Sequence, residues 1–139
     1  MIELLVVAIG GGVGAAARFV VDGEIRARHT GGFPWGTFVV NVTGSFLIGV
    51  FSSLFFSLAR PFPVDHATAM LQLALTVGLC GGFTTFSTAT VESARLARSG
   101  RMRLALANSL GTLVVTVASV GLGTAMSTVV IRAAGWLLS

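Results

Sequence analysis

Polar residues recur at helical spacing inside segments that are otherwise apolar. Three such stripes occur: Thr37, Asn41, Ser45 and Gly49; Asn108, Thr112, Thr116, Ser119 and Gly123; and Gly10, Gly14 and Arg18. Residues three or four apart share a helix face, and small residues on that face let two helices pack closely. Close packing alone does not explain two amides and an arginine, because such groups are costly in hydrocarbon without partners. The stripes therefore favour a pathway for something polar, with tight packing as the alternative.

The chemistry of the stripes favours an anion. Arginine, asparagine, serine and threonine all offer hydrogen-bond donors. A cation or proton pathway usually requires an aspartate or glutamate in mid-membrane. Every carboxylate here lies at or beyond the end of an apolar segment: Glu3, Asp22, Glu24, Asp65 and Glu92. Donors without deep carboxylates therefore predict an anion pathway.

The stretch GGFTTFSTAT, residues 81–90, combines glycine, phenylalanine and hydroxyl side chains. Gly81 and Gly82 predict an unwound turn, because glycine is a poor helix former. Carbonyls freed by such a turn are tolerated in a bilayer only inside protein, where they suit a hard cation. Phe83 and Phe86 lie on neighbouring faces, and a phenylalanine can turn its electropositive edge to an anion. A packing kink is the alternative. The hydroxyls in this stretch are those of Thr84, Thr85, Ser87 and Thr88.

The elements that carry these residues are membrane helices. The chain has 139 residues, is 54% hydrophobic and 10% charged, and has a mean hydropathy of +0.91. A membrane-spanning helix needs about 20 apolar residues. Four windows qualify, at residues 2–21, 36–58, 67–89 and 104–126. We predict an all-α membrane protein, one four-helix transmembrane subunit over residues 1–139, with a break in the third helix. The tail after Met126 ends near Trp136, a predicted interfacial anchor.

The charged and sulfur-bearing residues exclude several other classes. All nine basic residues are arginines that cluster between apolar segments, which is typical of headgroup anchoring rather than nucleic-acid binding. Glu3 replaces the basic start of a signal peptide. Cys80 is the only cysteine, and His29 and His66 lie in separate loops, so neither an intrachain disulfide nor a histidine metal site is expected. The sequence has no nucleophile–base pair or phosphate loop, and we predict no enzyme.

The arginines also predict an orientation. Six belong to the first and third loops: Arg26, Arg28, Arg95, Arg98, Arg101 and Arg103. Only Arg60 and Arg132 mark the opposite side of the membrane. The positive-inside rule therefore places both chain termini outside.

Three segments resemble the signature sequences of the Fluc (CrcB) fluoride channel family. They read GGGVGAAARF, PWGTFVVNVTGSFLIG and GLCGGFTTFST, in this order. The resemblance implies a passive, fluoride-selective channel of the cell (inner) membrane that exports cytoplasmic fluoride. It implies an antiparallel, dual-topology dimer with two fluoride pores along the subunit boundary. It also implies a central sodium ion (Na+), structural and not transported, held by main-chain carbonyls at the third-helix break.

The resemblance further implies roles for individual residues. The main-chain carbonyls of Gly81 and Thr84 would hold the sodium ion. Arg18 and Glu92 would belong to the vestibule. The fluoride pore would be lined by Asn41, Phe86, Ser87, Thr88, Asn108 and Thr112, with Phe83 as a compensating ring.

Two departures from the family pattern bear on assembly. Ala89 stands where the second phenylalanine of the family's motif would be, and the chain has no tyrosine, with Leu104 in the region where relatives have one. A homodimer of opposed subunits requires a chain that inserts both ways, whereas the arginine bias prefers one orientation. The dimer is therefore expected either with itself or, as the bias favours, with an oppositely oriented paralogue.

Two other functions remain as alternatives. A dual-topology exporter of the small multidrug type also has four short helices, but it depends on a glutamate embedded in the first span. Here only Glu3, at the edge of that span, is available. A non-conducting membrane subunit of a heterodimer would use the stripes for packing alone.

Overall fold

In the computed structural model, which describes residues 1–58 and 65–137, every regular element is a helix. The first two long helices are α1 (Ile2–Arg28) and α2 (Trp35–Leu58). The third comprises α3 (His66–Leu73), the π-helix η1 (Ala74–Cys80), α4 (Gly81–Phe83) and α5 (Phe86–Arg98). The fourth comprises α6 (Met102–Leu106), the π-helix η2 (Ala107–Gly111) and α7 (Thr112–Leu137).

Within the described part of the chain, four helices are long and apolar enough to cross a membrane. They cover Ile2–Arg28, Trp35–Leu58, His66–Arg98 and Met102–Gly135. The predicted all-α fold with four membrane helices is therefore confirmed. The helices run past the predicted windows at several ends, because helical hydrogen bonding continues beyond the apolar stretch. The tail after Met126 is a continuation of α7. The backbone of Arg60 and the side chain of Trp136 lie outside the described parts.

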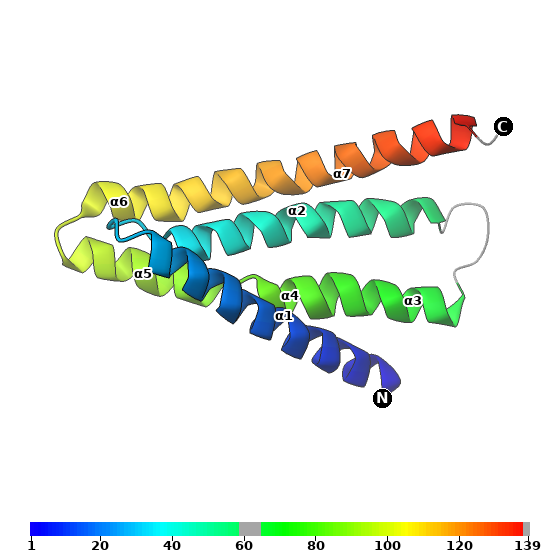
Figure 1. Cartoon of the computed structure of the whole chain (residues 1–139), viewed down its shortest axis with the longest axis horizontal. Helices are drawn as coiled ribbons and strands as arrows, with labels where there is room; N and C mark the ends of the chain where they lie inside the picture. Colours follow the sequence, from blue (N-terminus) through cyan, green and yellow to red (C-terminus); the bar gives the residue numbers. More distant parts are fainter. Residues whose placement is uncertain (59–64, 138–139) are drawn as a thin grey trace.

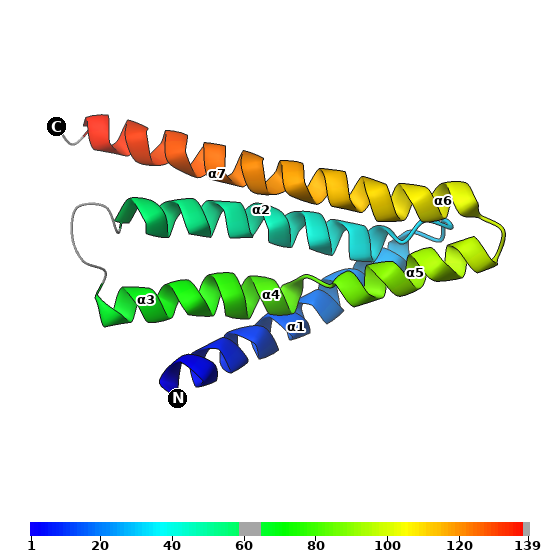
Figure 2. The ribbon, with the colours of Figure 1, turned by 180° about the vertical axis from the view of Figure 1, so that it is seen from behind.

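The long helices run roughly along one axis, with α2 between α7 and the third helix (Figure 1). Helix α1 crosses the third helix and packs mainly on η1 and α4. The α5–α6 turn and the α1–α2 loop lie at one end of the bundle, and the start of α1 and the end of α7 lie toward the other end (Figures 1 and 2). Most predicted loop arginines therefore gather at the end away from the termini.

Glycine stripes bring the helix backbones into direct contact. A Cβ atom on Gly49 would overlap the Val120 carbonyl, and one on Gly123 would overlap the Phe46 carbonyl, so α2 and α7 pack backbone to backbone. Gly14 of α1 lies equally close to the Leu79 carbonyl in η1. The glycines of the stripes thus serve close packing, as small residues do in membrane bundles, and they bring the polar members of the same stripes into the interior.

The third helix is interrupted two residues later than the glycines predict. Gly81 and Gly82 are helical, whereas Thr84 (φ −79°, ψ 159°) and Thr85 (φ −149°, ψ 114°) are extended. The prediction of an unwound turn at the glycines is therefore wrong in its position. Gly82 serves close packing instead, because a Cβ atom there would overlap the Gly11 carbonyl of α1.

Candidate functional site

A cavity of about 410 Å³ lies beside the interruption, between α2, α5 and the start of the fourth helix. We call it the break cavity. Its lining includes Phe86 and Ala89 but neither an acidic nor a basic residue. Ten of its lining residues carry polar side chains: Asn41, Ser45, Thr84, Thr85, Thr90, Ser93, Asn108, Ser109, Thr112 and Thr116. Polar residues of the stripes in the second and fourth membrane helices thus meet in one space, although Thr37 and Ser119 of those stripes do not line it.

Asn41 joins α2 to the interrupted backbone through two hydrogen bonds. Its Nδ2 donates to the Thr85 carbonyl at 3.0 Å, and the Thr85 N–H donates to its Oδ1 at 2.7 Å. These bonds replace helical partners, since a helix end leaves backbone groups without them. Asn41 is only 7% exposed, and Nδ2 keeps a second hydrogen for another acceptor. The amide therefore holds the interrupted conformation and can still donate into the break cavity.

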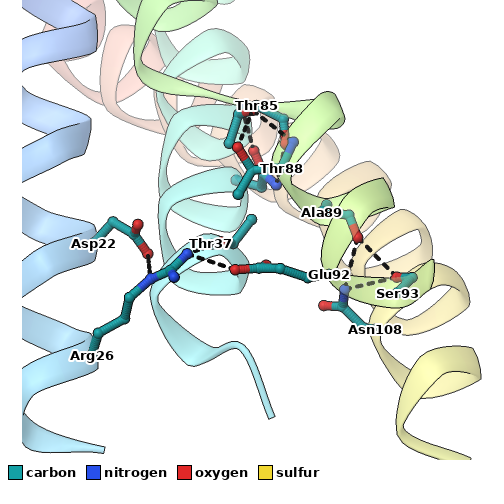
Figure 3. Close-up of polar contacts among 10 residues, drawn as sticks. Asp22, Arg26, Thr37, Thr85, Thr88, Ala89, Glu92, Ser93 and Asn108 are labelled. Atoms are coloured by element: carbon teal, nitrogen blue, oxygen red, sulfur yellow. Dashed lines mark hydrogen bonds and ion pairs between the residues drawn. The ribbon is translucent and has the colours of Figure 1, made fainter. Parts of the chain in front are cut away.

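The Thr85 hydroxyl begins the next helix. It accepts a hydrogen bond from the Thr88 N–H at 3.2 Å and donates to the Thr88 hydroxyl at 3.0 Å. Threonine at this position satisfies one of the N–H groups that a helix start leaves free. Thr85 therefore ends one helix through its backbone and caps the next through its side chain (Figure 3).

Asn108 is fully buried and ties the fourth helix to α5. Its Nδ2 donates to the Ala89 carbonyl at 3.1 Å and to the Ser93 hydroxyl at 2.8 Å, and the Ser93 hydroxyl donates to Ala89 at 2.9 Å (Figure 3). Both amide hydrogens are thus used. Three buried side-chain atoms of the described residues have no hydrogen-bond partner: Asn108 Oδ1, the Thr112 hydroxyl oxygen and Glu92 Oε2. The Thr112 hydroxyl is therefore a donor that the chain itself leaves free.

Glu92 pairs with an arginine that the sequence did not single out for the site. The Arg26 guanidinium contacts Glu92 Oε1 at 2.5 Å, Asp22 Oδ1 at 3.0 Å and the Thr37 hydroxyl at 3.3 Å (Figure 3). This cluster connects α1, α2 and α5. Arg18 makes none of these contacts and instead lines a second cavity.

The second cavity has a volume of about 290 Å³ and lies on the α1 side of the interruption. Arg18, Thr37 and Thr88 line it, and Thr85 lines both cavities. Several predicted site residues therefore divide between two spaces that meet at Thr85, whereas neither space is lined by Gly81, Phe83, Ser87 or Glu92. Arg18 and Thr88 belong to the smaller space. Asn41, Phe86, Asn108 and Thr112 belong to the break cavity.

The two phenylalanines do not share a helix. The interruption separates Phe83 in α4 from Phe86 in α5, so the expectation that they occupy neighbouring faces of one helix is wrong. Phe83 is half-buried and packs on α2, where a Cβ atom on Gly44 would lie 3.2 Å from its ring. Phe86 is 87% exposed on the single chain, and Ser87 beside it is also exposed.

Main-chain carbonyls are the available metal ligands near the interruption. The described residues contain no group of three or more His, Cys, Asp or Glu side chains that could hold a metal ion. The Gly81 carbonyl loses its usual helical partner, because the Thr85 N–H donates to Asn41 instead. Gly81 is also exposed. Neutral carbonyl oxygens of this kind fit a hard cation such as sodium.

Comparison with known proteins identifies the relatives of this fold. The profile described as "CrcB-like protein, Camphor Resistance (CrcB)" matches residues 5–124. The chain belongs to the CrcB family. Together with its four apolar helices, this makes it a multi-pass membrane protein.

CrcB relatives match nearly the full chain. A Phocaeicola vulgatus protein is 41% identical over 127 residues, covering 91% of this chain and 99% of the relative. A Leifsonia xyli protein is 42% identical over 120 residues (86% and 82%), and a Streptomyces avermitilis protein is 38% identical over 133 residues (96% and 97%). The first is named "Fluoride-specific ion channel FluC", and the other two carry the same name with the number 1.

Two residues of this CrcB chain have structural roles that the sequence analysis missed. Arg26 follows Asp22 by four residues, a spacing that predicts an ion pair on one helix face, but its contact with Glu92 depends on the packing of α5. Thr85 is of a residue type preferred at a helix N-cap, and that preference was a usable signal for the start of α5.

Proposed function

We propose that this chain is a subunit of a passive, fluoride-selective channel that exports cytoplasmic fluoride. The observation that carries the proposal is the break cavity, where hydroxyl and amide groups gather without a carboxylate. The names of the CrcB relatives support fluoride as the ion. A small, strongly hydrated anion needs several close donors to replace its water, and a negative side chain would repel it.

The Thr112 hydroxyl is a donor of the break cavity that no other group of the described chain engages. It is buried and has no partner, whereas the hydroxyls of Thr84 and Thr90 already donate to helix carbonyls. The second Nδ2 hydrogen of Asn41 adds a donor on the facing helix. The Asn108 amide acts indirectly, because its hydrogens hold Ala89 and Ser93 of α5 in place.

Structural sodium is part of the same proposal. The carbonyls of Gly81 and Thr84 would hold it, since both flank the point where helical hydrogen bonding stops. A bound cation supplies positive charge that offsets the cost of an anion at low dielectric. Asn41 contributes by fixing the extended backbone that presents these carbonyls.

An antiparallel dimer would complete the channel. Phe86 is a large apolar residue in the lining of the break cavity, yet 87% of its surface is exposed on one chain. A second subunit over this face would enclose both the ring and the cavity. The partner is either a second copy or an oppositely oriented paralogue, and expression of this chain alone separates the two. A stable, fluoride-conducting dimer of one chain excludes a required paralogue.

A pair of matched variants tests the channel. Thr112→Val keeps the shape of the side chain and removes the free donor, while Thr90→Val removes a hydroxyl of the same cavity that donates to the Phe86 carbonyl at 2.9 Å. A hydrogen bond to a charged group contributes about 1.5–3 kcal/mol. We therefore expect fluoride release from loaded liposomes to fall at least about tenfold for Thr112→Val and to stay near wild type for Thr90→Val.

A fluoride-selective electrode measures the fluoride released from the liposomes. Release from wild-type liposomes without a coupled cation or drug supports a channel and excludes the exporter alternative. No release from any reconstituted dimer identifies a non-conducting subunit. Equal fluoride release by Thr112→Val and Thr90→Val would show that the Thr112 hydroxyl does not take part in conduction.

A further inference from the structure

A third cavity lies at the arginine-rich end of the bundle, away from the break cavity. It has a volume of about 430 Å³ and is bounded by the end of α1, the loop that precedes α2, and the second half of α5. Arg26, Trp35, Glu92, Arg95 and Ser99 are among its lining residues. Its lining thus combines guanidinium groups with an aromatic ring.

Several arginines at this end of the bundle have no carboxylate partner. In the described part of the chain, Arg26 is paired with Asp22 and Glu92, and Arg28 is paired with Glu24 at 2.6 Å. The described structure records no ion pair for the other arginines of this end: Arg95, Arg98, Arg101 and Arg103.

Two of these unpaired arginines border the cavity. Arg95 lines it directly. The Arg101 guanidinium lies against Gly32, another lining residue, since a Cβ atom on Gly32 would overlap it. Glu92 also lines the cavity: its Oε1 pairs with Arg26, which also pairs with Asp22, and its buried Oε2 has no hydrogen-bond partner. An unpaired guanidinium beside a cavity suits a phosphate group, which it can bind through two parallel N–H groups.

The position of the cavity indicates the membrane interface. Helix α1 has 27 residues and is about 40 Å long at 1.5 Å per residue, which exceeds a hydrocarbon core of about 30 Å. The ends of the helices therefore reach the headgroups. Trp35 is 44% exposed, and its ring packs on Phe33 and Phe38 with centroids 4.8 and 5.9 Å away. Tryptophan in such a place is typical of an interfacial belt.

We propose that this cavity binds the headgroup of an anionic phospholipid, with the phosphate on Arg95 and the Trp35 ring at the level of the glycerol backbone. The proposal goes beyond ion conduction and does not depend on which ion the channel carries. The charge complementarity and the interfacial tryptophan together favour a lipid phosphate over a free anion.

Quenching of Trp35 by brominated lipid tests the site. The protein is placed in nanodiscs of phosphatidylcholine with increasing fractions of brominated phosphatidylglycerol, and Trp136→Phe leaves Trp35 as the only tryptophan. Arg95→Gln removes the charge in the cavity. Arg98→Gln is the matched control, because Arg98 lies on the same helix, is exposed, and is not a lining residue.

We expect half-maximal quenching to need at least about tenfold more phosphatidylglycerol in Arg95→Gln, the factor equivalent to the ~1.5 kcal/mol lower limit for a hydrogen bond to a charged group. Arg98→Gln should match the parent protein, and brominated phosphatidylcholine should quench more weakly. Equal losses in both variants, or equal quenching by the two lipids, would show general attraction and overturn the site. Reversal of the quenching by inorganic phosphate would assign the cavity to free anions and also overturn it. Fluoride release in phosphatidylcholine liposomes, measured alongside, tests the channel separately.

Discussion

Replacing Asn41 by leucine should destabilise the fold through the backbone of Thr85. The substitution introduces an apolar side chain of similar size and removes both hydrogen bonds between α2 and the interruption, at 2.7 and 3.0 Å. The N–H and the carbonyl of Thr85 would then lack partners inside the bundle. Neither group can return to a helical partner without rebuilding the extended residues that separate α4 from α5.

The size of the effect follows from these two groups. A buried hydrogen-bonding group without a partner costs about 1–3 kcal/mol, so two cost about 2–6 kcal/mol. Hydrogen bonds between membrane helices average only about 0.6 kcal/mol, which sets a lower limit of about 1 kcal/mol for the pair. A loss between about 1 and 6 kcal/mol is large beside a typical total stability of about 5–15 kcal/mol.

Reversible unfolding in mixed micelles measures this free energy, with Thr43→Leu as the control. Thr43 also lies on α2, but it is exposed, so its substitution removes no interior contact. Hydrogen exchange gives a local readout, because the Thr85 amide should exchange faster only in Asn41→Leu. If Asn41→Leu unfolds with the same free energy as Thr43→Leu and leaves Thr85 exchange unchanged, Asn41 does not hold the interruption.

Two further predictions concern packing and pH. Gly123→Ala should destabilise the bundle by about 1–3 kcal/mol, because its Cβ atom would overlap the Phe46 carbonyl. Gly121→Ala should leave the stability unchanged, because nothing lies within 4 Å of a Cβ atom at that position. Equal losses of unfolding free energy for the two variants in micelles would refute the contact. Hydrogen bonds from Thr68 hold the pKa of Asp65 below its ordinary value, so this cap should stabilise the start of α3 above about pH 3.9 and be lost as the pH falls through the lowered pKa. An NMR titration of Asp65 with a midpoint at or above 3.9 would contradict this.

The sequence predicts which faces of the helices turn inward. The four-residue spacing of Thr37, Asn41 and Ser45 places them on one side of any α-helix, and the cost of polar groups in lipid drives that side inward. Thr37 and Asn41 are buried, and Ser45 lines the break cavity, as the pattern requires. Composition alone also locates the ends of the apolar segments, and the sequence predicts on that basis that no carboxylate lies deep in a span.

Which residues of different helices form hydrogen bonds with one another could not be predicted from the sequence in the same way. The sequence placed the unwinding at Gly81 and Gly82, but the structure interrupts the helix at Thr84 and Thr85, where Asn41 supplies replacement hydrogen bonds. Glycine lowers the local cost of unwinding, yet the position depends on where a neighbouring helix offers partners. Here those partners belong to Asn41, which lies more than forty positions before Thr85 in the chain.

The sequence by itself therefore determined the membrane class, the four helices and the inward polar faces, and it predicts an anion pathway. These properties follow from hydrophobicity and helical period, which act on each segment separately. Only the tertiary structure decided that Arg26, rather than Arg18, pairs with Glu92, and that the Thr112 hydroxyl remains free while both amide hydrogens of Asn108 are used. Such choices depend on which atoms of different helices come within about 3 Å of one another, and helix packing sets those distances.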